Sequence, residues 1–263
     1  MTENKPLDPH YDPSKVRPKK GTKIKKMIAI VSGKGGVGKS TIAALLASHS
    51  QRAGYQSAII DGDIIGPSLS HLFNIHEAAG ADELGILPYI TPSGLKVLSS
   101  NMMVETETTP ILWRGPLISG AIKQFYTDVL WGELDLMVLD MPPGTGDVAL
   151  TVFQSLPIDG IIIVTSPQDL VSMIVSKAIE MAQTMSIPIL GIIENYSYLI
   201  CDECGHKMYP FGESKIEDIA LKYDLPIIAQ LPLDPTYSIL ADQGKIETID
   251  SEQFTWLVET IMK

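Results

Sequence analysis

Residues 33–41 read Gly33-Lys34-Gly35-Gly36-Val37-Gly38-Lys39-Ser40-Thr41, and they follow the apolar run at residues 27–31. The glycines let successive backbone N–H groups turn inward on phosphates without a clash from a Cβ atom. Lys39 can reach the outer phosphates, and Ser40 offers a hydroxyl to Mg²⁺ at the start of a helix. The stretch therefore predicts a site for ATP and Mg²⁺ between a strand and a helix.

The length and composition of the chain favour one large α/β domain. With 263 residues, of which 45% are hydrophobic, the chain can bury a substantial core. Its formal net charge of -11 argues against a main surface that grips nucleic acid or an anionic membrane, because such polyanions would be repelled. No apolar stretch resembles a secretory signal or is long enough to cross a bilayer, so we expect a cytoplasmic protein without a membrane partner.

Residues 1–24 are expected to form a mobile basic arm, followed by a single ATPase domain over residues 25–263. Residues 1–26 hold eight Lys and Arg against three acidic residues, and their prolines leave little that could pack. A solvated tail is the simpler interpretation of this arm. A specific binding role is the alternative, and it keeps association with DNA open.

Apolar runs of strand length alternate with helical patterns along the chain. The expected strands are 27–31, 57–61, 95–98, 134–140, 160–165, 189–194 and 227–231. The expected helices are 40–53, 67–73, 147–155, 170–185, 214–223, 235–243 and 251–262. This alternation predicts a doubly wound, mainly parallel sheet with helices on both faces. Residues 74–115 carry no clear pattern apart from the strand at 95–98, and they include a loop rich in Met, Thr and Glu that is expected to be mobile.

Polar residues follow the expected strands at the edge where parallel sheets bind their ligands. Asp140 is predicted to act on the Mg²⁺ held by Ser40, because a buried carboxylate is costly unless it is paired or near a metal; a helix N-cap is the alternative. Asp63 could orient the attacking water or bind Mg²⁺ through water. Asp61 could contact the same water shell or serve as a turn or cap residue. The Gly144 N–H is predicted to touch the terminal phosphate.

Lys34 is a second lysine where most phosphate loops have none. It could be a surface cation near the loop. Alternatively, it crosses to the nucleotide of a facing subunit and neutralises charge there, as an arginine finger does. In that case ATP would hold a homodimer together.

Cys201 and Cys204 form a Cys-x-x-Cys pair within a loop near residues 196–213, and they are the only cysteines in the chain. Two thiolates are half of a four-coordinate site, so a symmetric dimer would complete either a four-cysteine zinc site or a 4Fe-4S cluster. Thioredoxin-like redox catalysis or an inert turn is less expected. His206 could be a further ligand or a solvent-facing loop residue.

The ordered motifs resemble the Mrp family of iron-sulfur cluster carriers, also called ApbC, which belongs to the MinD/ParA-like deviant P-loop ATPases. The resemblance covers about residues 26–246. It rests on the phosphate loop, Asp61-Gly62-Asp63 with Gly66-Pro67-Ser68, Trp113-Arg114-Gly115-Pro116, residues 140–147, Gly191-Ile192-Ile193-Glu194-Asn195 and the two cysteines. Tyr196 stands where this family commonly has Met.

This resemblance implies a homodimer that hydrolyses ATP slowly, holds a labile 4Fe-4S cluster between facing cysteine pairs and passes it to apo iron-sulfur proteins. The residue roles it implies are Lys34 acting in trans, Lys39 and Thr41 on phosphates, Ser40 on Mg²⁺, Asp63 and Asp140 around the metal and water, and Asn195 on adenine. An amide suits the edge of adenine, although Asn at a strand end could also be a turn residue. A MinD/ParA-like positioning ATPase and an ATPase dimer with structural zinc remain alternatives.

Overall fold

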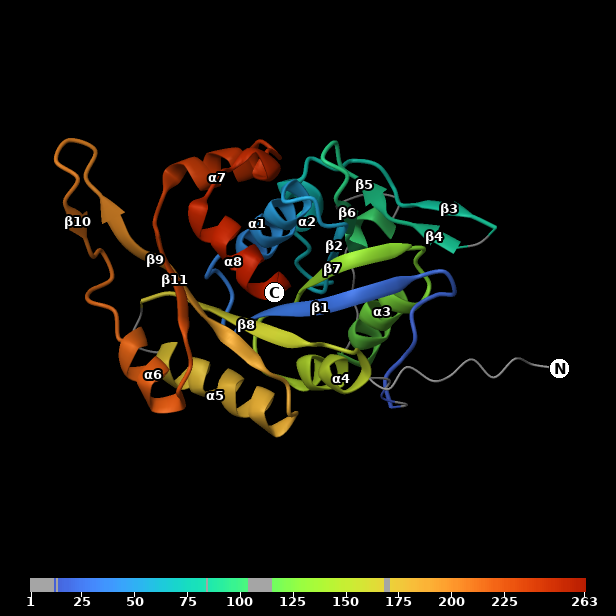
Figure 1. Cartoon of the computed structure of the whole chain (residues 1–263), viewed down its shortest axis with the longest axis horizontal. Coiled ribbons are helices and arrows are strands. Elements are labelled where there is room, and N and C mark those ends of the chain that lie inside the picture. The colour runs from blue at the N-terminus through green and yellow to red at the C-terminus, as the bar shows by residue number, and fades with distance from the viewer. Residues whose placement is uncertain (1–11, 13, 84, 104–114, 168–170) are drawn as a thin grey trace.

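The computed structural model describes residues 12, 14–83, 85–103, 115–167 and 171–263. Within them, one mainly parallel sheet carries helices on both faces, which confirms the predicted fold class (Figure 1). The strands are β1 (Lys23–Ser32), β2 (Ser57–Asp61), β3 (Gly80–Asp82), β4 (Gly85–Leu87), β5 (Tyr89–Ile90), β6 (Lys96–Leu98), β7 (Glu133–Asp140), β8 (Gly160–Thr165), β9 (Ile189–Ile200), β10 (Lys207–Met208) and β11 (Ile227–Pro232). The helices are α1 (Lys39–Arg52), α2 (Leu69–Leu72), α3 (Gly115–Thr127), α4 (Asp147–Ser155), α5 (Val171–Thr184), α6 (Ile216–Tyr223), α7 (Pro235–Asp242), α8 (Glu252–Met262) and the short 3₁₀ turns η1 (Ser100–Met103) and η2 (Ile246–Thr248).

The sheet places β1 at its centre. Parallel strands run in the order β11, β9, β8, β1, β7, β2 and β6, while β5 and β10 are antiparallel neighbours at the margins. Alternate residues of β1 enter different cores: Met27, Ala29 and Val31 face one cluster, whereas Ile28 and Ile30 face the other. Burial on both faces explains why this strand is apolar without alternating.

Each face of the sheet has its own layer of helices. Helices α1, α2, α7 and α8 cover one face, and α3, α4, α5 and α6 cover the other (Figure 1). Side chains from each layer join the hydrophobic cluster of that face. Within the described residues, no helix is both long and apolar enough to span a membrane.

Helix α3 and strands β3, β4 and β5 were not predicted from the sequence, whereas β6 matches the strand expected at 95–98. Ile118, Ile122 and Phe125 of α3 are buried at helical spacing, which is an amphipathic pattern that residues 115–127 already carry. The stretch of residues 74–103 that carried no clear pattern, apart from the strand predicted at 95–98, forms β3, β4, β5 and η1. Residues 104–114, including Trp113 and Arg114 of the family motif, lie outside the described residues.

The described part of the predicted basic arm contacts the domain. The Val16 N–H donates to the Ser155 carbonyl oxygen at 2.8 Å, and Lys15 Nζ donates to the Phe153 carbonyl oxygen at 2.7 Å. Strand β1 begins at Lys23, so the boundary expected at residue 24 falls inside a strand. Residues 1–11 and 13 of the arm lie outside the described residues.

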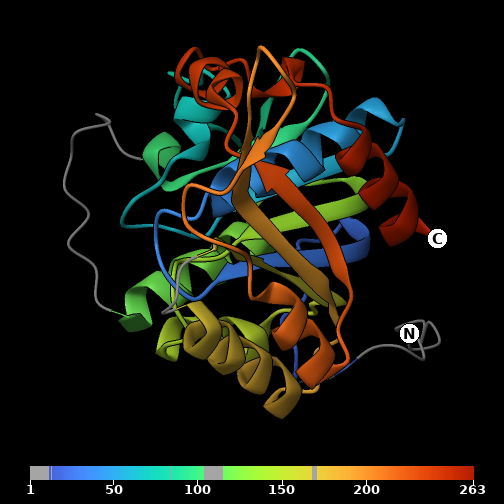
Figure 2. The ribbon, with the colours of Figure 1, turned by 90° about the vertical axis from the view of Figure 1, so that its left-hand side faces the viewer.

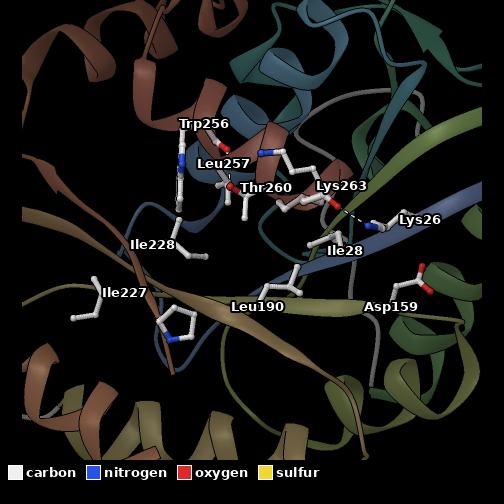
Figure 3. Close-up of a pocket in the computed structure, with 12 residues that line it drawn as sticks. Lys26, Ile28, Asp159, Leu190, Ile227, Ile228, Trp256, Leu257, Thr260 and Lys263 are labelled. Atoms are coloured by element: carbon white, nitrogen blue, oxygen red, sulfur yellow. Dashed lines mark hydrogen bonds between the residues drawn. The ribbon is translucent and has the colours of Figure 1, made fainter. Parts of the chain in front are cut away.

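A cavity of about 280 Å³ lies between α8 and strands β1, β9 and β11 (Figure 3). Its walls are mainly apolar and include Leu190, Ile228 and Trp256. Lys26 Nζ donates to the Ile261 carbonyl oxygen, which gives one terminal carbonyl of α8 a partner. This cavity contacts Lys26 and Ile28 in the middle of β1, whereas the phosphate loop follows the end of that strand.

Candidate nucleotide site and cysteine hairpin

The phosphate loop surrounds a cavity of about 290 Å³ at the carboxyl end of β1. The lining residues are Ser32, Lys34, Gly35, Gly36, Gly38, Lys39, Ser40, Thr41, Asp63, Pro143 and Tyr196. They come from the end of β1, the loop after it and the first turn of α1, from the loops after β2 and β7, and from β9. The structure therefore brings the phosphate loop, Asp63 and the segment after Asp140 to one place, as expected for the carboxyl edge of a parallel sheet.

The backbone of the phosphate loop fits closely against β9. Gly38 has φ of 79°, and a Cβ atom added there would lie 2.2 Å from Asn195 Nδ2. Asn195 Nδ2 donates to the Val37 carbonyl oxygen at 3.0 Å. Asn195 thus fixes the loop from behind, a contact that the sequence analysis did not anticipate. Gly38 is required both by its left-handed conformation and by this close approach.

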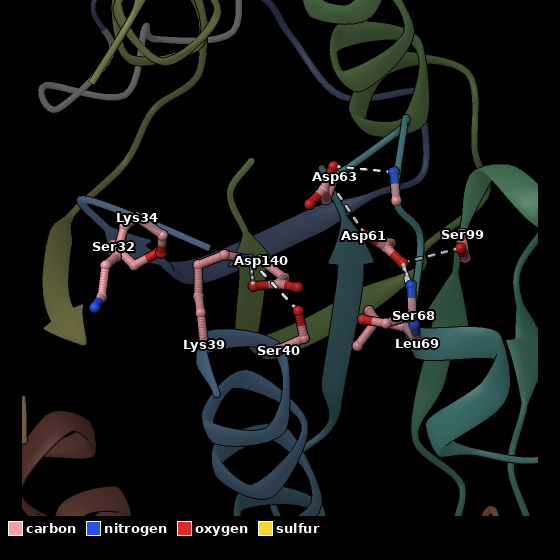
Figure 4. A network of polar contacts seen from close by, with 11 residues as sticks. Ser32, Lys34, Lys39, Ser40, Asp61, Asp63, Ser68, Leu69, Ser99 and Asp140 are labelled. Atoms are coloured by element: carbon pink, nitrogen blue, oxygen red, sulfur yellow. Dashed lines mark hydrogen bonds and ion pairs between the residues drawn. The ribbon is translucent and has the colours of Figure 1, made fainter. Parts of the chain in front are cut away.

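Lys39 and Asp140 form a buried ion pair at the floor of the site (Figure 4). The side chain of Lys39 is 7% exposed and that of Asp140 is completely buried. Burial raises the pKa of Asp140, while the Lys39 charge and a hydrogen bond from Lys39 oppose that rise. The predicted contact of Lys39 with phosphate remains a prediction.

One oxygen of Asp140 fits a metal-binding role. Among the residues that the structure describes, Asp140 Oδ2 is buried and has no hydrogen-bond partner. Ser40 lies beside the same ion pair, with its Oγ 3.5 Å from Lys39 Nζ. An uncompensated buried carboxylate oxygen near a hydroxyl is a suitable set of hard donors for Mg²⁺, directly or through water.

Asp61 organises the loop that follows β2. Its Oδ2 accepts hydrogen bonds from the Ser68 N–H at 3.0 Å, the Leu69 N–H at 3.1 Å and Ser99 Oγ at 3.0 Å. Its Oδ1 accepts from the Asp63 N–H at 3.1 Å (Figure 4). These contacts favour the turn or cap role that was one of two interpretations of Asp61.

The same burial changes the acidity of Asp61. Desolvation raises the pKa of its carboxyl to about 7, repulsion from Asp140 adds to that rise, and the hydrogen bonds from Leu69 and Ser99 oppose it. Asp63 is less enclosed, lines the phosphate cavity and accepts from the Gly66 N–H at 3.2 Å. Asp63 is therefore better placed than Asp61 to act on water or metal in the cavity.

Gly144 has a different partner here from the one predicted, whereas Lys34 lies where either of its two predicted roles is possible. The Gly144 N–H, assigned to the terminal phosphate, donates to the Ser32 carbonyl oxygen at 2.9 Å. A phosphate contact would require that bond to open, so it stays a prediction. Lys34 lines the cavity and is partly exposed, on the opposite side of the site from Asp61 (Figure 4). Both proposed roles of Lys34 remain compatible with this position.

Tyr196 and Pro143 also line the cavity, and neither was among the predicted site residues. Tyr196 adopts φ of 61°, which is uncommon for an aromatic residue. Its hydroxyl lies 2.9 Å from the position of a Cβ on Gly38. The position of Tyr196 directly after Asn195 was the available signal, since residues at the carboxyl end of a parallel strand tend to reach the ligand site.

The cysteine pair lies on a hairpin between β9 and β10 that projects from the body of the molecule (Figures 1 and 2). The Cys201 N–H donates to the His206 carbonyl oxygen at 3.0 Å, and the Gly205 N–H donates to the Cys201 carbonyl oxygen at 2.8 Å. Cys201 is half-buried and Cys204 is exposed. The tight turn therefore presents both thiols at the tip of the hairpin.

The turn favours the thiolate form of Cys201. The pKa of the Cys201 thiol is lowered mainly by a hydrogen bond from the backbone of Cys204, and next by one from the backbone of Glu203. Within the described part of the chain, no group of three or more His, Cys, Asp or Glu side chains could hold a metal ion. His206 is therefore not gathered with the two cysteines as a third ligand.

Comparison with known proteins identifies a family and close relatives. The family model described as ParA: NUBPL iron-transfer P-loop NTPase matches residues 23–263. An iron-sulfur cluster carrier protein of Clostridium perfringens is 40% identical over 237 residues, covering 87% of this chain and 83% of that protein. One from Methanococcus maripaludis is 41% identical over 248 residues, covering 92% of this chain and 86% of that protein.

Solved structures agree with the fold. A nucleotide-binding protein from Archaeoglobus fulgidus, in complex with ADP, is 40% identical with a TM-score of 0.78, covering 88% of this chain and 91% of its own. The septum site-determining protein MinD of Pyrococcus horikoshii is 20% identical with a TM-score of 0.62, covering 91% of this chain and 96% of its own. At that lower identity, the likeness to MinD supports the shared fold alone.

Proposed function

The chain belongs to the NUBPL iron-transfer P-loop NTPase family, and from that premise we propose that it is an ATP-hydrolysing homodimeric carrier. It holds a bridging 4Fe-4S cluster and passes that cluster to apo iron-sulfur proteins during their maturation. The observation that carries this proposal is a pair of thiols on a projecting hairpin, in the same domain as a phosphate loop with its own buried ion pair. Relatives at about 40% identity are named iron-sulfur cluster carrier proteins.

The nucleotide half of the proposal rests on the phosphate cavity. Residues 33–41 hold the phosphates through backbone N–H groups, with Lys39 and Thr41 as side-chain partners. Ser40 and Asp140 hold Mg²⁺, which when bound neutralises phosphate charge and fixes its geometry. Asp63 orients water at the open side of the cavity. The contact of Asn195 with adenine rests on the family resemblance.

The partner subunit completes both functional sites in this proposal. Lys34 reaches the nucleotide of the facing subunit, where its charge favours the developing negative charge on the phosphates. Cys201 and Cys204 supply two thiolates, and the same pair on the partner supplies the other two that a 4Fe-4S cluster needs. The lowered pKa of Cys201 favours the ligating thiolate form.

Anaerobic reconstitution tests the cluster assignment. Protein incubated with iron and sulfide should gain sulfur-to-iron charge-transfer absorption and about four iron and four sulfide per dimer. Cys201→Ala should lose both, whereas Glu203→Gln, on the same turn, should retain them. The loaded protein should then restore activity to an apo enzyme that requires a 4Fe-4S cluster. Retained zinc without charge-transfer absorption would instead favour a structural zinc dimer.

A further inference from the structure

Glu194 is a buried carboxylate that the nucleotide and cluster assignments leave without a role. It lies near the middle of β9, and its residue is 2% exposed. Its oxygens accept hydrogen bonds from Ser197 Oγ at 2.6 Å, Ser214 Oγ at 2.7 Å and Gln230 Nε2 at 3.1 Å. Burying a carboxylate costs free energy unless it is hydrogen-bonded. The three donors that converge on Glu194 meet this cost and hold the segments that carry them together.

Ser197 and Ser214 lie at the two ends of the segment that forms the cysteine hairpin, residues 198–213. Ser197 precedes residues 198–213, which contain Cys201 and Cys204, and Ser214 follows them. Both hydroxyls donate to the same carboxylate, so Glu194 joins the outgoing and returning stems at the base of the hairpin. Ser214 Oγ also accepts from the Ile216 N–H at 3.1 Å, which ties the returning stem to α6.

The residues that follow Glu194 reach the phosphate loop. Asn195 donates to the Val37 carbonyl oxygen, and Tyr196 lines the phosphate cavity. Residues 194–197 therefore carry two attachments: the outer pair, Glu194 and Ser197, holds the hairpin, while the inner pair, Asn195 and Tyr196, meets the phosphate loop and its cavity. Because these attachments share one short backbone segment, a shift of the phosphate loop must also act on the base of the hairpin.

We propose that Glu194 is a positioning residue that couples nucleotide occupancy of the phosphate loop to the conformation of the cysteine hairpin. This inference rests on the proposed function, because it assigns the hairpin and the nucleotide site to one cycle. A carboxylate is suited to this task since both of its oxygens accept hydrogen bonds, whereas an amide offers one acceptor oxygen and turns an NH₂ toward donors. By linkage, a ligand at the cysteines must affect nucleotide binding by the same factor.

The test measures how nucleotide changes thiol reactivity in reduced, metal-free, full-length protein. Rates of alkylation of Cys201 and Cys204 by N-ethylmaleimide are measured by mass spectrometry, with and without saturating Mg-ADP. For the wild type, we expect the alkylation rate with Mg-ADP to differ from the rate without it by about threefold or more, which is within the usual range of coupling between sites. In Ser214→Ala the ratio should approach one, while the dissociation constant for Mg-ADP stays within about twofold.

Ser93→Ala is the matched control, because Ser93 Oγ also donates to a carboxylate, that of Glu247, away from both sites. It should keep the wild-type ratio. In Glu194→Gln the ratio of alkylation rates with and without Mg-ADP should approach one, as in Ser214→Ala. Circular dichroism establishes whether Glu194→Gln is folded. If it is not folded, the result for Ser214→Ala decides. A wild-type ratio of one, or an unchanged ratio in folded Ser214→Ala, would overturn the proposal. Because neither iron nor zinc is present, either result is independent of whether iron-sulfur reconstitution succeeds.

Discussion

Three buried ionisable side chains dominate the chemistry of the candidate nucleotide site. Lys39 and Asp140 pair directly, and Asp61 lies close enough for the Asp140 charge to raise its pKa. A lone lysine between two carboxylates leaves one negative charge poorly compensated within a buried network. The two acids can relieve this imbalance by taking up a proton, or by sharing the site with a cation such as Mg²⁺.

Asp61 should make the nucleotide-free protein less stable as pH rises from about 4 to 7. Its pKa is raised in the folded state from 3.8 to about 7, so in this range the folded protein binds more protons than the unfolded chain. The contribution is fully present at low pH and is lost as pH rises through the folded pKa. In Asp61→Asn, the free energy of unfolding, measured with urea, should fall less steeply across this range.

Asp218→Asn provides the control for this pH series, because Asp218 is exposed on α6. It should keep the wild-type slope of stability against pH. The comparison uses slopes, since Asp61→Asn also disturbs the loop contacts and lowers stability at every pH. An Asp61→Asn slope equal to that of the wild type would show that Asp61 is ionised throughout the range.

Gly38→Ala should abolish tight nucleotide binding while the domain remains folded. The new Cβ would lie 2.2 Å from Asn195 Nδ2, and φ of 79° disfavours any residue with a Cβ. The loop must move away from Asn195, so we expect at least about a tenfold loss of affinity for Mg-ADP by titration calorimetry. Gly120→Ala, in α3 with open space around it, should bind normally. Wild-type affinity in Gly38→Ala would contradict the fitted geometry of the loop.

Secondary elements were predictable where one physical signal dominated. The strands predicted at 57–61 and 160–165 match β2 and β8. Each is a short, mainly apolar run between turns, which is the pattern of a strand buried on both faces of a sheet. Helix α3 was missed although its buried residues recur at helical spacing; it begins with Gly115 and Pro116, so no N-cap or helix-forming residue marks its start. The length of β9 was also missed, since polar Glu194, Asn195 and Ser197 interrupt its apolar pattern.

Helix α7 depends on its first turn. Asp234 is its N-cap and accepts from the Thr236 N–H at 2.8 Å, and Pro235 occupies the first helical position. Asp234→Ala should lower the free energy of unfolding by about 1 kcal/mol, because that N–H loses its partner. Asp234→Ser should retain most of the stability, since serine also caps helices. Equal urea midpoints for all three proteins would show that α7 does not contribute to the cooperative transition.

At the level of the whole molecule, the sequence predicted which motifs meet but not how they are connected. The phosphate loop and Asp63 line one cavity, as strand order in a parallel sheet dictates. The contacts of Asn195 with Val37 and of Glu194 with two serines could not be predicted, because they join residues whose spacing carries no recognisable pattern. Such contacts depend on register and packing between distant segments.

Lys34→Ala and Lys39→Ala test whether the nucleotide site is shared between two subunits. Each variant alone should lose ATPase activity with its fold intact. If Lys34 acts across the dimer, a mixed dimer has one complete site: the Lys34→Ala subunit keeps Lys39, and its partner supplies Lys34. Equimolar random pairing should therefore restore about a quarter of wild-type activity. Activity is followed by phosphate release, and assembly by light scattering with Mg-ATP.

The matched control mixes Lys34→Ala with a Lys34→Ala/Lys39→Ala double variant. Those chains can pair in the same way, but no dimer among them carries Lys34 opposite an intact Lys39, so activity should stay at background. Recovery in the first mixture alone would establish action in trans, because neither subunit is competent by itself. If the first mixture also stays at background while co-purification of differently tagged subunits shows mixed dimers, Lys34 must serve the nucleotide of its own subunit.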